Sequence, residues 1–255
     1  MKLGIFYQMW YEHQKAAYES LKQLRKVYPT EEIVLQVTGV YKKDLEKFKQ
    51  EFLDLIQVKF NINKVVHLHR DDYVGYFDRQ RTVQDLLSYN DALLDYSFNT
   101  LEEDTDFMLF GSEDLYVFKQ IPIDPSCDIC CNPREWSSWM NPKAKDVFNY
   151  GITDKILWFQ HGHYLNLKKF KQVFTPENRK YVLDNLAELY PDAQNIYSDY
   201  FTSIWSTLAC KTYKPVYDYL IELPSEVTDE TPLETFKRTN CYARHGYKEL
   251  YGEQL

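Results

Sequence analysis

The sequence predicts an α/β fold with a mostly parallel central sheet and helices on both of its faces. Between residues 2 and 118, four short apolar runs alternate with three segments of helical periodicity. Parallel strands need a crossover between them, so this alternation is typical of a parallel sheet. The chain of 255 residues is 44% hydrophobic and 27% charged, and it is long enough to bury a sizeable core.

Each element of the first half follows from its own pattern. Short apolar runs predict strands over residues 2–8, 32–39, 64–69 and from 107 onward. Apolar residues three and four positions apart predict helices over residues 12–27, 42–57 and 79–98. The first helix ends at Tyr28-Pro29, because a proline disfavours helical backbone in the residue before it.

The second half is less regular. Residues 121–143 are rich in Pro, Cys and Trp and predict a loop. Residues 156–167 predict a strand with a turn near Gly162, and helices are expected over 176–189 and 198–210. The tail from residue 222 is polar, with a possible helix at its end. No composition change marks a domain boundary, so we expect one domain.

Composition excludes several classes of protein. A net charge of −8 argues against a nucleic-acid binder. No apolar run reaches the roughly 18 to 20 residues of a membrane span, and the N-terminal run lacks the pattern of a signal peptide. We therefore expect a cytoplasmic protein without an integral membrane segment, or one that reaches membranes only through partners.

Common catalytic patterns do not occur in the sequence. Glycine-rich dinucleotide and P-loop motifs are absent, and so is the GxSxG elbow. The five cysteines are an odd number without a secretion signal, which predicts reduced thiols. Three of them crowd into residues 127–131, but their spacing is a weak match to a zinc site.

The strongest chemical signal lies at the fourth strand. Open α/β sheets bind ligands at the carboxyl ends of their strands, and the run FMLFGSEDLYVF delivers Glu113 and Asp114 to that edge. Carboxylates are ligands for Mg²⁺ or Mn²⁺, which bridge protein to diphosphate. The alternative is a solvated acidic turn, and the strand ending alone does not decide between them.

Several segments together resemble one family. The triplet Ser112-Glu113-Asp114 after an apolar strand resembles the DxD motif of GT-A-fold nucleotide-sugar glycosyltransferases, with Ser112 departing from it. The opening KLGIFYQMWYEHQKAAYESLKQLRKVYPTEEIVLQVTG and the segments WFQHGHYLNLKKFKQV and SDYFTSIWSTLACKTYKPVYDY resemble theirs in order, over about residues 2–220. The similarity is to family-2-like members and to enzymes of large DNA viruses.

The resemblance implies a GT-A, Rossmann-like fold over residues 1–255. About 1–118 would bind a nucleotide-diphosphate sugar, and about 119–255 would hold the glycan or glycoprotein acceptor and the C-terminal tail. The implied reaction is metal-assisted transfer of a hexose or pentose to a hydroxyl, with inversion. Asp114 and His245 would bind Mn²⁺ or Mg²⁺, and Asp199 would be the general base. An ordinary exposed histidine is the favoured alternative for His245. Asp199 is equally well explained as a helix cap.

Further positions are expected at the site, some because they follow a strand at the ligand edge and others from the resemblance, although each also fits an ordinary polar loop or an exposed side chain. The positions expected to bind the donor are Gln8, Thr38, Arg70, Asp71, Asp72, Arg79, Arg81, Glu113, Arg244 and Lys248. The positions expected on the acceptor side are His161, Gly162 and His163.

Two other functions remain open. A sugar nucleotidyltransferase shares a related sheet but usually needs a glycine-rich loop near the N-terminus, and YQMWYEHQ has none. A non-catalytic GT-A domain that serves as a binding or scaffold module is favoured by Ser112, which stands where the motif usually has a carboxylate. Nucleotide-sugar turnover separates this module from an enzyme, because one fold hosts many functions.

Overall fold

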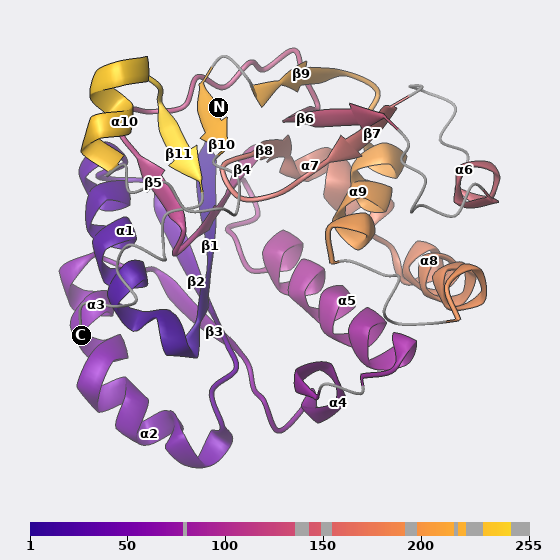
Figure 1. Ribbon diagram of the computed structural model, residues 1–255, viewed down its shortest axis with the longest axis horizontal. Helices are drawn as coiled ribbons and strands as arrows, with labels where there is room; N and C mark the ends of the chain where they lie inside the picture. The colour runs from indigo at the N-terminus through magenta and orange to yellow at the C-terminus, as the bar shows by residue number, and fades with distance from the viewer. Residues whose placement is uncertain are drawn as a thin grey trace.

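The computed structural model describes residues 1–78, 81–135, 143–148, 155–191, 198–216, 219–222 and 232–245. These residues form a central sheet with helices on both of its sides (Figure 1). A smaller sheet lies above the first helix in the same view.

The central sheet contains eight described strands in the order β3-β2-β1-β4-β8-β6-β7, with β9 beside β6. The strands β3, β2, β1 and β4 are parallel, and β8 joins β4 in the antiparallel direction. The strands of this sheet are β1 (Leu3–Trp10), β2 (Glu32–Thr38), β3 (Lys64–Leu68), β4 (Phe107–Ser112), β6 (Ile129–Glu135), β7 (Lys155–Trp158), β8 (Tyr164–Asn166) and β9 (Tyr213–Pro215).

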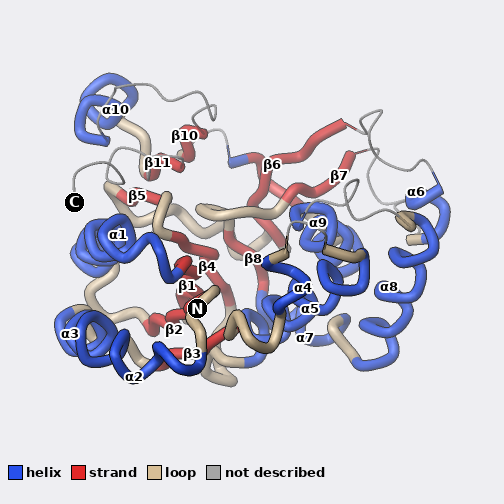
Figure 2. The backbone as a smooth tube through the Cα atoms, turned by 60° about the horizontal axis from the view of Figure 1, so that its bottom comes forward, coloured by secondary structure: helices blue, strands red, loops and turns tan. Residues whose placement is uncertain are grey.

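Helices cover both faces of this sheet. The helical segments of the first half are η1 (Tyr11–His13), α1 (Gln14–Val27), η2 (Lys42–Asp44), α2 (Leu45–Phe48), η3 (Lys49–Leu53), α3 (Asp54–Lys59), α4 (Val74–Phe77) and α5 (Val83–Asn99). Those of the second half are α6 (Lys143–Val147), α7 (Leu167–Val173), α8 (Pro176–Leu189), α9 (Ser198–Ala209) and α10 (Pro232–Thr239). Figure 2 shows α1, α2 and α3 on one side of the strands and α5, α7, α8 and α9 on the other.

The alternation of side chains along β1 explains the two layers. Phe6 belongs to one buried cluster, with residues of α5, α7, α8 and α9. Ile5 and Tyr7 belong to the other, with residues of α1, η3 and α3. Because successive side chains of a strand point to opposite faces, a strand covered on both faces is apolar along its whole length. This confirms the predicted α/β fold.

The smaller sheet brings the end of the described chain to the acidic triplet. It contains β5 (Leu115–Val117), β10 (Leu220–Glu222) and β11 (Ala243–His245) in the order β10-β11-β5. In the antiparallel pair of β11 with β5, His245 lies opposite Leu115. The backbone of His245 is therefore next to the turn that carries Asp114.

Two sequence predictions are wrong in detail. Residues 121–143, predicted as a loop, contain the strand β6. The helix predicted over 79–98 begins at Val83, because Thr82 and Asp85 form a reciprocal capping box there. Arg81 therefore precedes this helix instead of opening it, and Arg79 lies outside the described residues.

All five cysteines are free thiols, as predicted. In the described part of the chain, every helix falls short of the length and apolar character that a bilayer crossing requires.

Candidate active site

The candidate site lies where β1, β2 and β4 end. Their register places Gln8 of β1 between Gln36 of β2 and Ser112 of β4. Two residues later, Trp10 pairs with Thr38. Side chains just beyond these positions share one edge of the sheet, as expected for parallel strands.

The turn after β4 separates its two carboxylates. The Ser112 hydroxyl donates a hydrogen bond to Asp114 Oδ1, and the Asp114 side chain is 15% exposed. Glu113 is 2% exposed, its Oε1 lies 2.8 Å from His13 Nδ1, and it is not among the residues that line the cavity described next. Asp114 is thus the carboxylate of the triplet that faces the candidate site.

A cavity of about 290 Å³ lies beside Asp114. Its apolar and aromatic lining comes from the first strand, from α4 and α5, and from the strand ends opposite. The lining residues are Gln8, Trp10, Tyr76, Tyr89, Asn90, Leu93, Phe110, Asp114, Phe159, Gln160, His161 and Thr202. An apolar cavity with a few convergent polar groups is the usual form of a small-molecule site.

His161 connects two of the predicted site residues across this cavity. Its Nδ1 lies 3.5 Å from Asp114 Oδ1, and its Nε2 lies 3.4 Å from Gln8 Oε1. Both distances are long for hydrogen bonds, and active-site contacts often shorten when substrate binds. The imidazole is therefore placed to interact with a ligand that enters between these residues.

A buried hydrogen-bond network forms the floor of the site. The Tyr89 hydroxyl lies 3.0 Å from Thr38 Oγ1, and Gln8 Nε2 donates to it at 3.5 Å. Gln36 Nε2 donates to Thr38 Oγ1 at 2.5 Å. Burial raises the pKa of Tyr89 well above its ordinary value, so the phenol stays protonated at neutral pH. Thr38 is fully buried within this floor.

Aromatic rings and arginines form the outer rim. Tyr76 stacks on Tyr89 with ring centroids 3.7 Å apart, and Trp10 lies 5.8 Å from Phe77 in a perpendicular arrangement. The Arg81 guanidinium lies 5.6 Å from the centre of the Tyr76 ring. This rim offers flat π surfaces and positive charge side by side.

Arg70 occupies the part of the rim beyond β3. Its guanidinium lies 5.1 Å from the Phe77 ring centre and 5.3 Å from that of Tyr41. Its Nη1 is 3.5 Å from Glu12 Oε1, in a weak ion pair between half-exposed side chains. These contacts hold the guanidinium in place while leaving it open to solvent.

The structure brings some predicted site residues together and separates others. Gln8, Asp114 and His161 line the cavity. Asp71 and Asp72 instead bind Lys42, through its backbone N–H and its ammonium group respectively. The positions that the fold places in the interior are Thr38, Glu113, His163 and Arg244.

Gly162 forms the turn between two of the acceptor-side positions. Its φ of +86° favours glycine, and an added Cβ would lie 3.0 Å from Leu220 Cδ1. The Gly162 N–H donates to Phe110 O at 2.7 Å. This tight turn directs His161 toward the cavity and places His163 in the core, where it is 0% exposed.

Four predicted positions lie partly or wholly outside the described residues. Lys248 and Arg79 are outside them. Asp199 belongs to the first turn of α9, so it lies inside the helix and not at its cap. Thr202, three residues later in α9, lines the cavity and donates to Phe159 O at 3.0 Å. The side chains of Asp199 and His245 are not described.

Few described side chains at the site could bind a hard cation. Among the described side chains, no three His, Cys, Asp or Glu groups are close enough together to hold a metal ion. Mg²⁺ usually takes only one or two protein carboxylates and completes its shell with substrate phosphates and water. Asp114 at the cavity, with the His245 backbone beside its turn, fits that requirement.

Sequence reasoning missed the wall of the cavity that α4 and α5 supply. Tyr76, Tyr89 and Asn90 lie in helical segments, where the sequence pattern does not distinguish them from other helix residues. The sequence gives no clear signal for Asn90, because an asparagine within a helix commonly bonds to a backbone carbonyl one turn earlier, as it does here. Their convergence on Asp114 depends on how α5 packs against the sheet.

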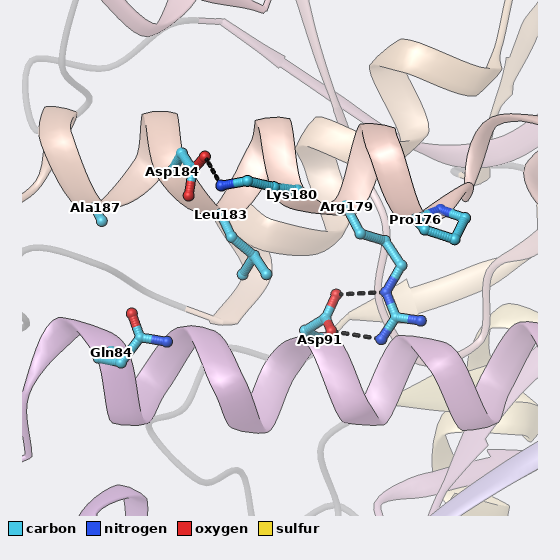
Figure 3. A pocket seen from close by; sticks show the side chains of 8 residues that line it. All are labelled: Gln84, Asp91, Pro176, Arg179, Lys180, Leu183, Asp184 and Ala187. Carbon is cyan, nitrogen blue, oxygen red and sulfur yellow. Dashed lines mark hydrogen bonds and ion pairs between the residues drawn. The ribbon is translucent and has the colours of Figure 1, made fainter.

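A second hollow of about 390 Å³ lies between α5 and α8 (Figure 3). Arg179 Nε and Nη2 donate to the two Asp91 oxygens at 3.1 and 2.6 Å, and Nη1 donates to Asp95 at 2.9 Å. Lys180 and Asp184 pair at 2.6 Å along α8. Because the charged groups around this hollow pair with one another, we assign them to the contact between the two helices.

The sequence matches no known protein-family profile, and no curated protein sequence matches it. Solved structures do match. A galactosyltransferase LgtC bound to donor and acceptor sugar analogues has a TM-score of 0.52 at 14% identity, covering 95% of this chain and 86% of its own. An active-site mutant of LgtC gives 0.51 at 15%, over the same shares of both chains.

A third solved structure extends the comparison. The bifunctional glycosyltransferase WbbM has a TM-score of 0.50 at 10% identity, over 96% of this chain and 45% of its own. Sequence identities this low show a shared fold only. The resemblance to viral enzymes therefore stays a prediction. The central sheet with helices on both faces agrees with this likeness in fold. This chain therefore has the GT-A fold of nucleotide-sugar glycosyltransferases.

Proposed function

We propose that the protein transfers a sugar from a nucleotide-diphosphate donor to a hydroxyl group of a glycan or glycoprotein. The observation that carries this proposal is the cavity at the sheet edge, where Asp114 and His161 face aromatic and polar side chains. A mostly apolar cavity with one carboxylate suits a sugar ring attached to a diphosphate. The fold is the one in which such chemistry occurs among the solved structures named above.

The rim supplies the contacts that the nucleotide needs. A base stacks on an aromatic face such as that of Phe77, outside the cavity lining, and the guanidinium groups of Arg70 and Arg81 attract phosphate oxygens. Asp114 and His245 would hold Mn²⁺ or Mg²⁺, which supplies positive charge for a departing diphosphate when bound. This metal assignment extends the sequence prediction.

Asp199 is the proposed base. It lies in the first turn of α9, one helical turn before Thr202 of the cavity. Its carboxylate would accept the proton of the acceptor hydroxyl. The acceptor hydroxyl oxygen then forms a bond to the anomeric carbon of the donor sugar. The bond from this carbon to the diphosphate oxygen breaks at the same time. The electron pair leaves with the diphosphate, and the configuration inverts.

A non-catalytic binding module is the second candidate. Ser112 favours it, because the hydroxyl that bonds Asp114 adds no negative charge to a cation site. A module of this kind would bind the nucleotide sugar at the same edge of the sheet without consuming it. Binding and turnover therefore need to be measured separately.

The deciding experiment uses the whole protein with manganese chloride and a panel of uridine and guanosine diphosphate sugars. Thermal unfolding shows which compounds bind, because a ligand of the native state raises the unfolding temperature. Release of nucleoside diphosphate then measures turnover, with and without manganese. Slow hydrolysis of a bound donor supports the enzyme, while binding without release supports the module. An unfolding temperature unchanged by every compound overturns both.

A further inference from the structure

An incompletely bonded amide lines the cavity. Asn90 of α5 is 2% exposed, and its Nδ2 donates to Leu86 O at 2.8 Å. Its Oδ1 is buried and has no hydrogen-bond partner among the described residues. Since only the amide nitrogen can donate to a carbonyl, this bond fixes the side chain with Oδ1 as the atom left for a ligand.

A buried acceptor without a partner destabilises a folded protein, so its presence in a cavity needs a reason. A ligand that donates a hydrogen bond at this position removes the penalty. In the absence of a ligand, a water molecule can donate this hydrogen bond, and the ligand displaces that water on binding. Asn90 therefore selects for a hydrogen-bond donor rather than an acceptor.

The remaining lining restricts the charge of that ligand. Among the described residues around the cavity, Asp114 is the one carboxylate, and lysine and arginine do not occur. Gln8, Gln160 and Thr202 are neutral, and the other walls are aromatic or aliphatic. The cation proposed at Asp114 would be bound by the diphosphate, so a carboxylate on the sugar would be desolvated without a lysine or arginine of the described lining to pair with it.

We propose that Asn90 determines which sugar is transferred: its Oδ1 accepts a hydrogen bond from one hydroxyl of a neutral sugar in this cavity. The sugar's apolar face packs against Trp10 and Tyr76, and uronic acids are rejected. This inference rests on the proposed function, because it assigns the cavity to the sugar part of the donor.

The test compares the wild-type protein with Asn90→Leu, which has a similar volume and no acceptor. Asn99→Leu is the matched control, since Asn99 ends the same helix, is exposed and lies outside the cavity lining. Calorimetry with manganese chloride measures the affinity for nucleoside diphosphate alone and for its glucose, galactose, xylose and glucuronate derivatives. Thermal unfolding without ligand reports whether each variant is folded.

We expect Asn90→Leu to bind the nucleoside diphosphate like the wild-type protein and its preferred neutral nucleotide sugar about tenfold more weakly. Monodeoxy analogues of that sugar identify the hydroxyl. One deoxy analogue should bind the wild-type protein about tenfold more weakly than the parent sugar does. The same analogue should bind Asn90→Leu no more weakly than the parent sugar binds that variant, as in a double-mutant cycle. Asn99→Leu should match the wild-type protein throughout.

Different results separate the two proposals. If the wild-type protein binds no nucleoside diphosphate or nucleotide sugar, the proposed function fails and this inference falls with it. If it binds a neutral nucleotide sugar and Asn90→Leu binds that compound equally well, the proposed function stands and the role of Asn90 is overturned. Tightest binding of the glucuronate derivative would overturn the selection for a neutral sugar.

Discussion

At the scale of single residues, the contact between Ser112 and Asp114 governs what a substitution at either position does. Asp114→Ala should abolish manganese-dependent binding of a nucleoside diphosphate and leave the unfolding temperature without ligand nearly unchanged. His245→Ala should weaken binding less, because the carboxylate carries the charge that attracts the cation. Calorimetry checks both, and unchanged affinity in Asp114→Ala would remove Asp114 from the metal site.

Ser112→Asp separates stability from metal binding. Ser112 is 1% exposed and donates to Asp114, so an aspartate there would place two carboxylates in contact. We expect a lower unfolding temperature in chelator and a larger rise on adding manganese than in the wild-type protein. Ser112→Ala is the control, because it removes the hydroxyl without adding charge. Equal manganese responses in all three proteins would contradict the prediction.

His67 gives the fold a dependence on pH. Burial, His69 and Lys49 lower the pKa of His67 from 6.5 to about 4. Between these values the unfolded chain carries a proton on His67 that the folded chain lacks, so stability falls as the pH falls through this window. Between pH 7 and pH 4.5, the free energy of unfolding should fall by about 1 kcal/mol less in His67→Gln than in the wild-type protein. This figure allows for solvent screening of the half-buried ring. Urea denaturation at both pH values measures this, and equal losses in both proteins would argue against it.

At the scale of elements, the first turn of α9 carries the proposed base. Asp199→Asn should lower sugar transfer by about 10² to 10⁴ while donor binding stays near normal, because proton transfer matters only in the transition state. A carboxylate in a first turn stabilises a helix by about 0.3–1 kcal/mol, so the unfolding temperature should change little. Product formation is measured by chromatography. Asp184→Asn, at an exposed helical carboxylate of α8, is the control.

Full turnover in Asp199→Asn would move the search for a base to His161, which already contacts Asp114 across the cavity. The same outcome would leave Asp199 as a residue of the helix start with no part in the chemistry.

The elements that the sequence predicted are those with a plain periodic pattern. The four parallel strands and the helices α1, α5, α8 and α9 follow from apolar spacing. The strand β6 was hidden because its sequence, ICCNPRE, contains Asn and Pro133 and buries its cysteines as small apolar residues. The helix α7 was missed because its start, capped by Asn166, follows directly on β8.

At the scale of the whole molecule, the candidate site was predictable only where strand ends determine it. Gln8 and Asp114 follow from the rule that ligands bind beyond the carboxyl ends of parallel strands. Asn90 and Tyr76 do not, because their place at the cavity depends on the packing of α4 and α5 against the sheet. Neither local pattern nor composition encodes that packing angle.

Arg179 joins helices from the two halves of the chain. Its guanidinium binds Asp91 with two hydrogen bonds and lies 4.9 Å from the Phe174 ring centre. Arg179→Met keeps the aliphatic stem but leaves Asp91, 15% exposed, without its partner. We expect a loss of about 2 kcal/mol in the free energy of unfolding, between the values for surface and buried pairs.

The pair Lys180 and Asp184 on the same helix provides the control. Both side chains are well exposed, so Lys180→Met should cost less than about 0.5 kcal/mol. Combining Asp91→Leu with Arg179→Met should recover part of the loss, because no charge is then left unpaired. Urea denaturation of the four proteins measures these differences, and equal effects of Arg179→Met and Lys180→Met would show that the pair does not join the halves.

The pairing of β11 with β5 also has a consequence for synthesis on the ribosome. The strands β1 to β4 emerge early and can assemble their sheet edge while later residues are still being added. The strand that flanks the acidic turn, β11, is the last described element to emerge. Under the proposed function, a nascent chain would expose a folded sheet edge that cannot yet hold a diphosphate. Donor consumption would then begin only after β11 has emerged and paired with β5.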